Sequence, residues 1–591
     1  MNGTKDFPSM RAGAGRHWTA LMAAVTVMLI IATMIARLAL GLSAVLGQPI
    51  SSSAPRLSGT AASCPITARG GQDSVIAWNS PQGDTEYVGY SSSRYVFRNS
   101  TYVGEAAPQL LQDDRIQFDQ QQIFQQNCKV DQAQRGAGRT VVELVYFAGL
   151  TEGPGEQYDS GEAEELEGLL AAQRNAFNDP GLPYLKIVVA NGGSKMQAAA
   201  RVAQMLIPLF RQQRDLLGVV GLDRSIKQVQ QAIHVFEASK IPVVATTLSA
   251  DAIAGSSNDP LYRYYFQLSA SNKQEAHLVL QYIQQIVPHY FEQPHILYPS
   301  GGHATPTRIV IYQPSADSND LYISSLVSDL QEEAPGFSGI PPLTFTDQLG
   351  PPLSLCGNSS VDIYAGRHDR PLAAQSQNDD FTQFLQTIES CPATAKPFII
   401  ADDGVSRFVA DPAARAEPLG DVSVSYVTKG VAIMQTGAKC LNAATDIQVP
   451  PQQRLFCQAY ATIVSQLLSQ PGLRGHQFTL WTGDRVGLAY DAARLFLEAV
   501  RHYQDQDGSK PITRTQIPGQ FESGTYSGVT GTVSFTATSH TGADTPQGMP
   551  LAVVRIHLSL PSAMPTCQYL SQDGQLFGGG PNPGRCPDGT N

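Results

Sequence analysis

The sequence predicts an α/β fold with two lobes in series, each built around a parallel β-sheet. From about residue 140 onward, short apolar runs alternate with amphipathic stretches of ten or more residues. Strands that alternate with helices of this length are typical of βαβ units, which form parallel sheets. The alternation is then repeated further along a chain of 591 residues, which is long enough for two cores of ordinary size.

An apolar segment precedes the α/β region. Residues 18–36 include no charged side chain, and as a helix they would be about 28 Å long, close to the thickness of a bilayer core. Basic residues precede this segment, which favours a cytoplasmic N-terminus and export of the rest. We therefore expect a cytoplasmic N-terminus over 1–17 and a single transmembrane anchor over 18–46, with the bulk of the chain outside the cell membrane. The alternative is a cleaved signal segment, which would give a secreted protein.

Charge and cysteine content agree with an exported protein that binds no nucleic acid. The net charge is −11, whereas a nucleic-acid partner requires a basic face. An even number of cysteines beyond an export segment indicates disulfide bonds. Spacing does not decide their pairing, and a neighbouring pair such as Cys440 with Cys457 is one possibility among many. The eight cysteines are Cys64, Cys128, Cys356, Cys391, Cys440, Cys457, Cys567 and Cys586.

Three segments lie outside the alternating pattern. Residues 47–63 are rich in Ser and Pro and are expected to form a flexible linker. Residues 64–139 form a polar N-terminal extension of unknown role. Residues 566–591 form a Gly- and Pro-rich tail.

The first lobe is expected over about 140–300 and 437–507. Its predicted strands are continuous apolar runs, as in sheets that are buried on both faces. Strands are predicted at 140–148, 184–193, 216–221 and 241–245, and helices at 162–175, 195–213, 225–239, 273–287 and 487–504.

The second lobe is expected over about 306–436 and 508–565, so that the whole two-lobed domain covers 140–565. Late segments of the chain are expected to return to each lobe. Strands are predicted at 307–314, 361–366, 397–402, 430–436, 531–537 and 551–559, and helices at 320–334 and 380–390.

Polar residues cluster where the predicted strands end. Ser225 follows the third strand, Thr247 and Ser249 follow the fourth, and Asp402 and Asp403 follow a strand of the second lobe. In open parallel sheets, ligands bind beyond the carboxyl ends of the strands. Hydroxyls and a helix N-terminus on one lobe can bind a carboxylate, and a carboxylate on the other lobe can bind an ammonium. The alternative for the hydroxyls is helix capping, and Ser225 with Gln228 fits a capping box.

The succession of motifs resembles a known family. "GVVGLDRS", "IPVVATTLSAD", "IVIYQPSADSND" and "PFIIADDGVSRF" occur in an order similar to that of the branched-chain amino-acid-binding proteins. These are type 1 periplasmic binding proteins, the substrate-binding components of ABC importers, and the resemblance covers roughly 140–559. It implies two Rossmann-like lobes that are joined by a three-stranded hinge and close on a ligand.

The resemblance also implies a set of binding residues. Ser225, Thr247 and Ser249 would hold the α-carboxylate and α-amino groups of an amino acid. Asp403 would bind the ammonium, with Asp402 as the near alternative. Further contacts are expected from Tyr158 of the first lobe and from Ser318 or Asn319, which stand where the family has an aromatic residue of the second lobe.

We therefore expect a membrane-tethered solute-binding protein that takes up an amino acid or a related small molecule and presents it to an ABC transporter permease. The alternative is a ligand-sensing ectodomain that acts through a partner protein. No motif of a hydrolase, a zinc protease or a phosphate-binding loop is present, so we expect neither an enzyme nor a cofactor.

Overall fold

The structure is a computed structural model. It describes residues 73–81, 85–98, 107–151, 161–253, 263–292, 306–314, 319–349, 355–357, 359–367, 380–410, 422–430, 451–470, 484–507, 511–535, 550–558 and 565–571. All of these residues belong to one compact unit. The expected membrane anchor and linker lie outside them, and within them we find no helix with the length and apolar character needed to cross a bilayer.

The first lobe is built on a seven-stranded sheet with the order β1-β2-β4-β3-β5-β6-β7. Strands β3 to β7 are parallel, and β2 pairs antiparallel with both β1 and β4. The strands are β1 (Ser74–Asn79), β2 (Thr85–Ser91), β3 (Val141–Ala148), β4 (Tyr184–Asn191), β5 (Leu216–Gly221), β6 (Val243–Ala245) and β7 (Tyr265–Gln267).

The second lobe repeats this topology in a seven-stranded sheet with the order β16-β15-β12-β11-β10-β8-β9. Its five parallel strands, β8 to β12, have the same relative order as β3 to β7, while β15 and β16 are antiparallel additions at one edge. The strands are β8 (Arg308–Tyr312), β9 (Leu343–Thr346), β10 (Ser360–Tyr364), β11 (Phe398–Ala401), β12 (Ser423–Thr428), β15 (Ala552–His557) and β16 (Thr566–Leu570).

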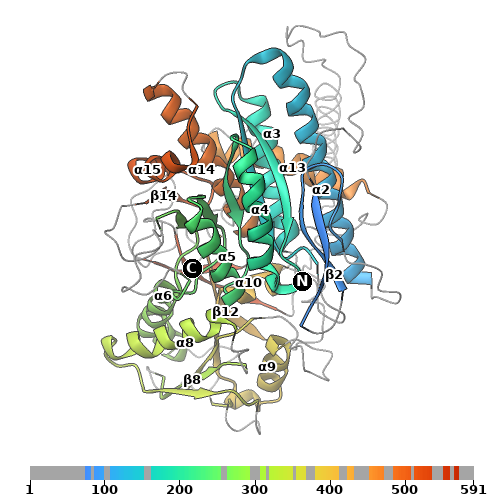
Figure 1. Ribbon diagram of the computed structural model, residues 1–591. Coiled ribbons are helices and arrows are strands. Elements are labelled where there is room, and N and C mark those ends of the chain that lie inside the picture. The colour runs from blue at the N-terminus through green and yellow to red at the C-terminus, as the bar shows by residue number, and fades with distance from the viewer. Residues whose placement is uncertain are drawn as a thin grey trace, which may run out of the picture. The chain divides into compact units, whose positions relative to one another are not determined.

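Helices cover both faces of the first sheet (Figure 1). Every residue of β3 is buried, because its side chains pack alternately against helices on either face. One face packs against α2 (Ala107–Ala137), α3 (Gly161–Asn178), α13 (Pro451–Leu468), α14 (Asp484–Asp507) and α15 (Ile517–Ser523). The other face packs against α4 (Ala199–Gln212) and α5 (Lys227–Ala238).

The second sheet is also covered on both faces, and Figure 1 shows α8 and α9 beside β8. One face packs against α6 (Asn272–Gln285), α7 (Val287–Glu292) and α8 (Leu321–Glu333). The other packs against α9 (Asp380–Glu389) and α10 (Ser406–Ala410). A separate hairpin and short 3-10 helices complete the described elements: β13 (Thr525–Ser527), β14 (Thr532–Ser534), η1 (Ser194–Met196), η2 (Ala334–Gly336), η4 (Ala393–Ala395), η5 (Asp403–Val405) and η7 (Arg514–Gln516).

The structure divides the chain between the lobes differently from the sequence analysis. Helix α6 packs on the second sheet rather than the first, because Tyr282 on its apolar face contacts Phe398 of β11 and Tyr569 of β16. Residues 511–535 pack on the first lobe instead of the second, through Phe521 and Phe535. The N-terminal extension supplies β1, β2 and α2 to the first lobe, and the start of the expected tail forms β16.

One strand of the second sheet was not anticipated. Strand β12 runs over Ser423–Thr428, ahead of the strand expected at 430–436, which lies outside the described residues apart from Gly430.

Among the described cysteines, Cys356 and Cys391 form a disulfide, and Cys128, Cys457 and Cys567 are also disulfide-bonded. Cys440 lies outside the described residues, so its suggested pairing with Cys457 stays a prediction.

Candidate functional site

The turn at the end of β5 directs a polar loop beyond the edge of the first sheet. Gly221 has φ +107° and Leu222 has φ +62°, so the chain leaves the strand through two residues in the left-handed region. A side chain at Gly221 would also clash with the carbonyl oxygen of Phe147, 2.7 Å from its Cβ. The reversal brings Asp223 and Ser225 to the carboxyl end of the sheet, beside the point where the order of the strands reverses.

Loops from both lobes meet around one cavity of about 30 Å³. This volume holds roughly two water molecules, so a ligand of several atoms requires the surrounding groups to move apart before it enters. The first lobe contributes Asp223, Ser225, Thr247, Ser249, Asp484 and Arg485, and the second contributes Tyr322, Arg367, Asp403, Gly404, Ser406 and Lys429.

Four of the seven residues expected at the site line this cavity together: Ser225, Thr247, Ser249 and Asp403. Asn319 is not among the residues that line the cavity, and its carbonyl oxygen accepts a hydrogen bond from the backbone amide of Lys227 at 3.2 Å. Tyr158 and Ser318 lie outside the described residues.

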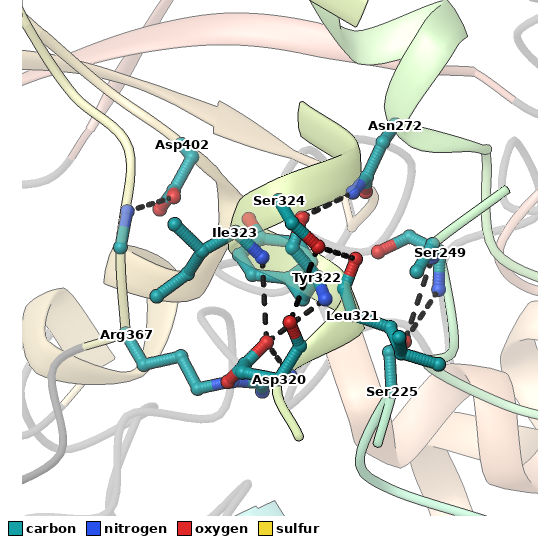
Figure 2. Close-up of polar contacts among 12 residues, drawn as sticks. Ser225, Ser249, Asn272, Asp320, Leu321, Tyr322, Ile323, Ser324, Arg367 and Asp402 are labelled. Carbon is teal, nitrogen blue, oxygen red and sulfur yellow. Dashed lines mark hydrogen bonds and ion pairs between the residues drawn. The ribbon is translucent and has the colours of Figure 1, made fainter. Parts of the chain in front are cut away.

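Ser225 does not cap a helix, contrary to the capping alternative. Helix α5 begins at Lys227, and its N-cap residue is Ile226, with no side-chain capping hydrogen bond. The Ser225 hydroxyl instead accepts long hydrogen bonds from the backbone amides of Ser249 (3.4 Å) and Ala250 (3.5 Å), as Figure 2 shows for Ser249. The hydroxyl therefore links the two loops that follow β5 and β6, and it can still donate its own proton toward the cavity.

The hydroxyl groups that follow β6 have two roles: one stabilises the fold, and the others line the cavity. Thr246 is fully buried and donates to the Glu165 carboxylate at 2.7 Å, so it holds α3 against the sheet. Thr247 lines the cavity, and its Oγ1 has no hydrogen-bond partner within the described part of the chain. Ser249 lines the cavity beside Ser225.

Asp402 and Asp403 occupy different surroundings although they are adjacent. Asp402 Oδ2 accepts from the backbone amide of Gly366 at 2.7 Å. Burial, followed by the charge of Asp403, raises the pKa of Asp402 well above its usual range, which favours its neutral form. Asp402 therefore supports the backbone, and it is Asp403 that lines the cavity.

Asp403 is held as an ion by partners of its own lobe, chiefly Lys429 and Tyr322. Its Oδ1 accepts from the Tyr322 hydroxyl at 2.5 Å, and its Oδ2 pairs with Lys429 Nζ. Burial opposes ionisation, but the positive charge of Lys429 outweighs it, so the pKa of Asp403 lies below its ordinary value. Lys429 is almost fully buried, and although burial disfavours its charge, Asp403 raises the pKa of the ammonium.

A second ion pair flanks this one. Arg367 Nε lies 2.6 Å from Asp320 Oδ2, and the guanidinium carbon is 4.9 Å from the centroid of the Tyr322 ring (Figure 2). Asp320 is also the N-cap of α8 and accepts from the backbone amides of Tyr322 and Ile323. The pair therefore fixes Tyr322, which in turn contacts Asp403.

The first lobe presents buried polar atoms that have no hydrogen-bond partner within the part of the chain that the structure describes. Arg485, in the first turn of α14, has a side chain that is only 3% exposed, and its Nη1 makes no hydrogen bond within the described residues. The nearest carboxylate oxygen is that of Glu165, 3.9 Å away. Asp223 Oδ1 is likewise buried without a donor among the described residues. Burial raises the pKa of the neighbouring Asp484 to about 7.

Direct contacts join the two lobes at the rim of the cavity. The backbone amide of Leu321, in the second lobe, donates to the Ser225 carbonyl at 3.0 Å, and Ile226 forms an isolated antiparallel bridge with Asp320. Beyond them, the Asp251 amide donates to the Ser325 hydroxyl of α8 at 3.1 Å. These contacts exist only while the lobes are together, so they define a closed arrangement.

The sequence analysis missed the cations of the site. Lys429 follows β12, which was not anticipated, and Arg485 lies in the first turn of α14, ahead of the helix expected from 487. In the sequence these two residues and Arg367 look like ordinary surface charges. The one available signal was position: Arg367 lies just after the strand at 361–366, where binding groups are expected.

No protein-family model matches the sequence, and no curated protein matches it. Solved structures similar to the chain include the branched-chain amino acid transporter substrate binding protein LivJ from Streptococcus pneumoniae in complex with isoleucine, at 14% identity over 73% of this chain and 100% of that one, with a TM-score of 0.47. The leucine binding protein LivK from Thermotoga maritima matches at 13% identity over 73% and 98% of the two chains, with a TM-score of 0.47.

A solute binding protein of an ABC transporter from Rhodopseudomonas palustris, in complex with 4-hydroxybenzoate, matches at 12% identity over 74% of this chain and 98% of that one, with a TM-score of 0.49. The chain is thus similar to substrate-binding proteins of ABC transporters.

Proposed function

We propose that this chain is an extracytoplasmic solute-binding protein, which binds a small carboxylate-bearing molecule between its lobes and presents it to an ABC importer. One observation carries the proposal: the carboxyl ends of two sheets with the same strand order supply polar groups to a single cavity. Such edges are where open α/β sheets bind ligands.

The cavity groups suit a carboxylate. Arg485 Nη1 and the Thr247 hydroxyl are buried donors without acceptors among the described residues, and the Ser225 hydroxyl has a proton to donate. A buried donor without an acceptor is costly, and a charged acceptor in reach of three such donors relieves that cost. The class of ligand is therefore an amino acid or a related small acid.

The mechanism is closure of the lobes. Ser225 and Thr247 belong to the first lobe, whereas Tyr322 and Lys429 belong to the second, so a ligand can contact all of them only when the lobes meet. A ligand with more contacts in the closed arrangement shifts the population toward it. The importer then distinguishes loaded from empty protein by shape.

The role we propose is binding rather than catalysis. A pair of carboxylates could act as acid and base only if both faced one substrate atom. Asp402 is engaged with the Gly366 amide, and Asp403 with Tyr322 and Lys429. Neither is left to transfer a proton to a ligand in the cavity.

Thermal unfolding of the full-length protein tests this function. We expect at least one small carboxylic acid, at millimolar concentration, to raise Tm by mass action. Thr247→Ala should abolish the shift and leave the melt without ligand nearly unchanged, because the hydroxyl has no partner within the described chain to lose. Ser523→Ala, at an exposed position, is the matched control. The proposal fails if no acid shifts the wild-type melt, or if Thr247→Ala shifts as the wild type does.

A further inference from the structure

The carboxylate expected to bind a ligand ammonium already has a cation. Lys429 Nζ pairs with Asp403 Oδ2, and the Tyr322 hydroxyl occupies Asp403 Oδ1. Lys429 follows β12 and Asp403 follows β11, which are neighbouring parallel strands of the second lobe. Because the pair lies within one lobe, separation of the lobes does not break it, and a ligand arriving at the open cleft finds Asp403 already neutralised.

The rest of the cavity wall opposes an additional cation. Arg367, Arg485 and Lys429 line it together with Asp223, Asp403 and Asp484, so a ligand ammonium would lie beside three cations and would find no excess of negative charge. Like charges that line one small cavity repel each other strongly when they are removed from water. Asp484, a first-lobe carboxylate whose charge interacts with Lys429, is partly neutral at pH 7 because burial raises its pKa to about 7.

Among the described carboxylates that line the cavity, Asp223 is the one with a buried oxygen that accepts no hydrogen bond. The charge of Arg485 is already close enough to interact with it. A neutral donor such as a hydroxyl would satisfy Asp223 Oδ1 without adding a positive charge beside Arg485. A ligand with a carboxylate at Arg485 and Thr247 and a neutral donor at Asp223 would therefore satisfy all three of these atoms.

We infer that the ligand is a small hydroxy acid or other carboxylic acid without an α-ammonium group, and that Lys429 is the residue that excludes amino acids. The inference rests on the proposed function and narrows its substrate class. Lys429 occupies the place at Asp403 that a ligand ammonium would otherwise take. Exclusion by a built-in cation is a repulsive element of specificity, in addition to the attractive contacts of the carboxylate.

Matched acid pairs test the inference directly. Each pair shares a carbon skeleton and differs only at the α-substituent: lactate and alanine, 2-hydroxy-4-methylpentanoate and leucine, and phenyllactate and phenylalanine. Calorimetric titration of the full-length wild type should give a Kd for at least one hydroxy acid that is about tenfold or more below that of its amino-acid partner. Lys429→Met should reverse this order, because it exposes the Asp403 carboxylate to the ligand.

The double variant Lys429→Met with Asp403→Asn is the control, because it removes both charges and should lose the preference for either member of a pair. If Lys429→Met fails to fold, the wild-type titrations alone test whether the protein prefers hydroxy acids to amino acids. Amino acids that bind the wild type as tightly as their hydroxy partners would overturn the inference and leave the proposed function intact. Failure of every acid to bind the wild type would overturn the proposed function, and the inference with it.

Discussion

At the scale of single residues, the position of Arg485 depends on the absence of a side chain at Gly161. A Cβ added to Gly161 would lie 2.6 Å from Arg485 Nη1 and 2.8 Å from its Cζ, closer than non-bonded atoms approach. Gly161 is the first residue of α3, so the helix begins with a glycine that leaves room for the guanidinium. The donor expected to hold the ligand carboxylate is therefore positioned by a residue that never touches the ligand.

Gly161→Ala should weaken ligand binding more than it weakens the fold. The added methyl group displaces the guanidinium, so we expect the Kd of the bound acid to rise by about tenfold or more, as for the loss of one charged hydrogen bond. The change in Tm should be small, because alanine favours the helix. Calorimetric titration and thermal unfolding of the same sample measure both quantities.

Gly519→Ala is the matched control. Gly519 lies in α15, and an added Cβ there meets no atom within 4 Å. It should leave the Kd unchanged. Equal Kd values for wild type and Gly161→Ala would show that Arg485 does not bind the ligand.

Residues also show the limit of the sequence as a guide to the site. Ser225, Thr247, Ser249 and Asp403 could be predicted to line a common cavity because each follows an apolar strand, and the strand ends of a parallel sheet lie at one edge. The role of Lys429 could not be predicted from the sequence, because its pairing with Asp403 depends on β11 and β12 being neighbours in the sheet. A pattern along the chain contains no information on which strand ends become adjacent.

At the scale of elements, continuous apolar runs predicted β3, β4, β5 and β6 close to their observed bounds, because these strands are buried on both faces. Strand β12, Ser423–Thr428, was not predicted because polar and apolar residues alternate in it. The bounds of α6 were predicted, but its lobe was not. A helix pattern shows which face is apolar and not which sheet covers that face.

Helix α2 of the N-terminal extension supplies hydrogen bonds to β4 where that strand has no neighbouring strand. Asn127 on α2 donates from Nδ2 to the Ile187 carbonyl at 2.7 Å and accepts from the Ile187 amide at 2.9 Å. The pairing of β4 with β2 covers only Val189–Asn191, so Ile187 has no strand partner on that side. Asn127 therefore supplies the hydrogen bonds of both backbone groups of Ile187. The side chain replaces a missing strand partner, so the extension is an integral part of the first lobe.

Asn127→Ala should therefore destabilise the protein. Both buried backbone groups of Ile187 would lose their partner, and we expect a fall of about 2 kcal/mol in the free energy of unfolding. Urea denaturation followed by circular dichroism measures it. Gln134→Ala, at an exposed position of the same helix, should change that free energy by less than about 0.5 kcal/mol. A similar cost for both variants would mean that Asn127 has no special role at the edge.

At the scale of the whole molecule, closure brings two carboxyl groups together at the rim of the cavity. Ser325 on α8 donates to Asp251 Oδ2 at 3.1 Å and lies 3.3 Å from Asp329 Oδ2. Burial, then a hydrogen bond with Asp251 and the charge of Asp251, raises the pKa of Asp329 to about 8. Asp251 belongs to the first lobe and Asp329 to the second, so separation of the lobes removes Asp251 from Asp329.

Closure should therefore take up a proton. With the lobes apart, Asp329 loses the hydrogen bond and the charge of Asp251, so its pKa falls from about 8 toward its ordinary value. A raised pKa stabilises the closed state fully at pH below about 4, and that contribution is lost as the pH rises through about 8. Because the ligand binds the closed state, its affinity should fall between pH 5 and 8, by up to about tenfold per pH unit.

Asp329→Asn isolates this effect from the other buried carboxyl groups that titrate in the same range, such as Asp484. Asparagine keeps the shape and a hydrogen bond to Ser325, and it has no proton to take up. The difference in log Kd between wild type and Asp329→Asn should increase steadily as titrations move from pH 5 to pH 8, with the wild type weakening more. Glu332, which also raises the pKa of Asp329, supplies the control: Glu332→Gln should leave most of the pH dependence in place. Parallel pH profiles for wild type and Asp329→Asn would mean that the carboxyl pair at the rim does not sense closure.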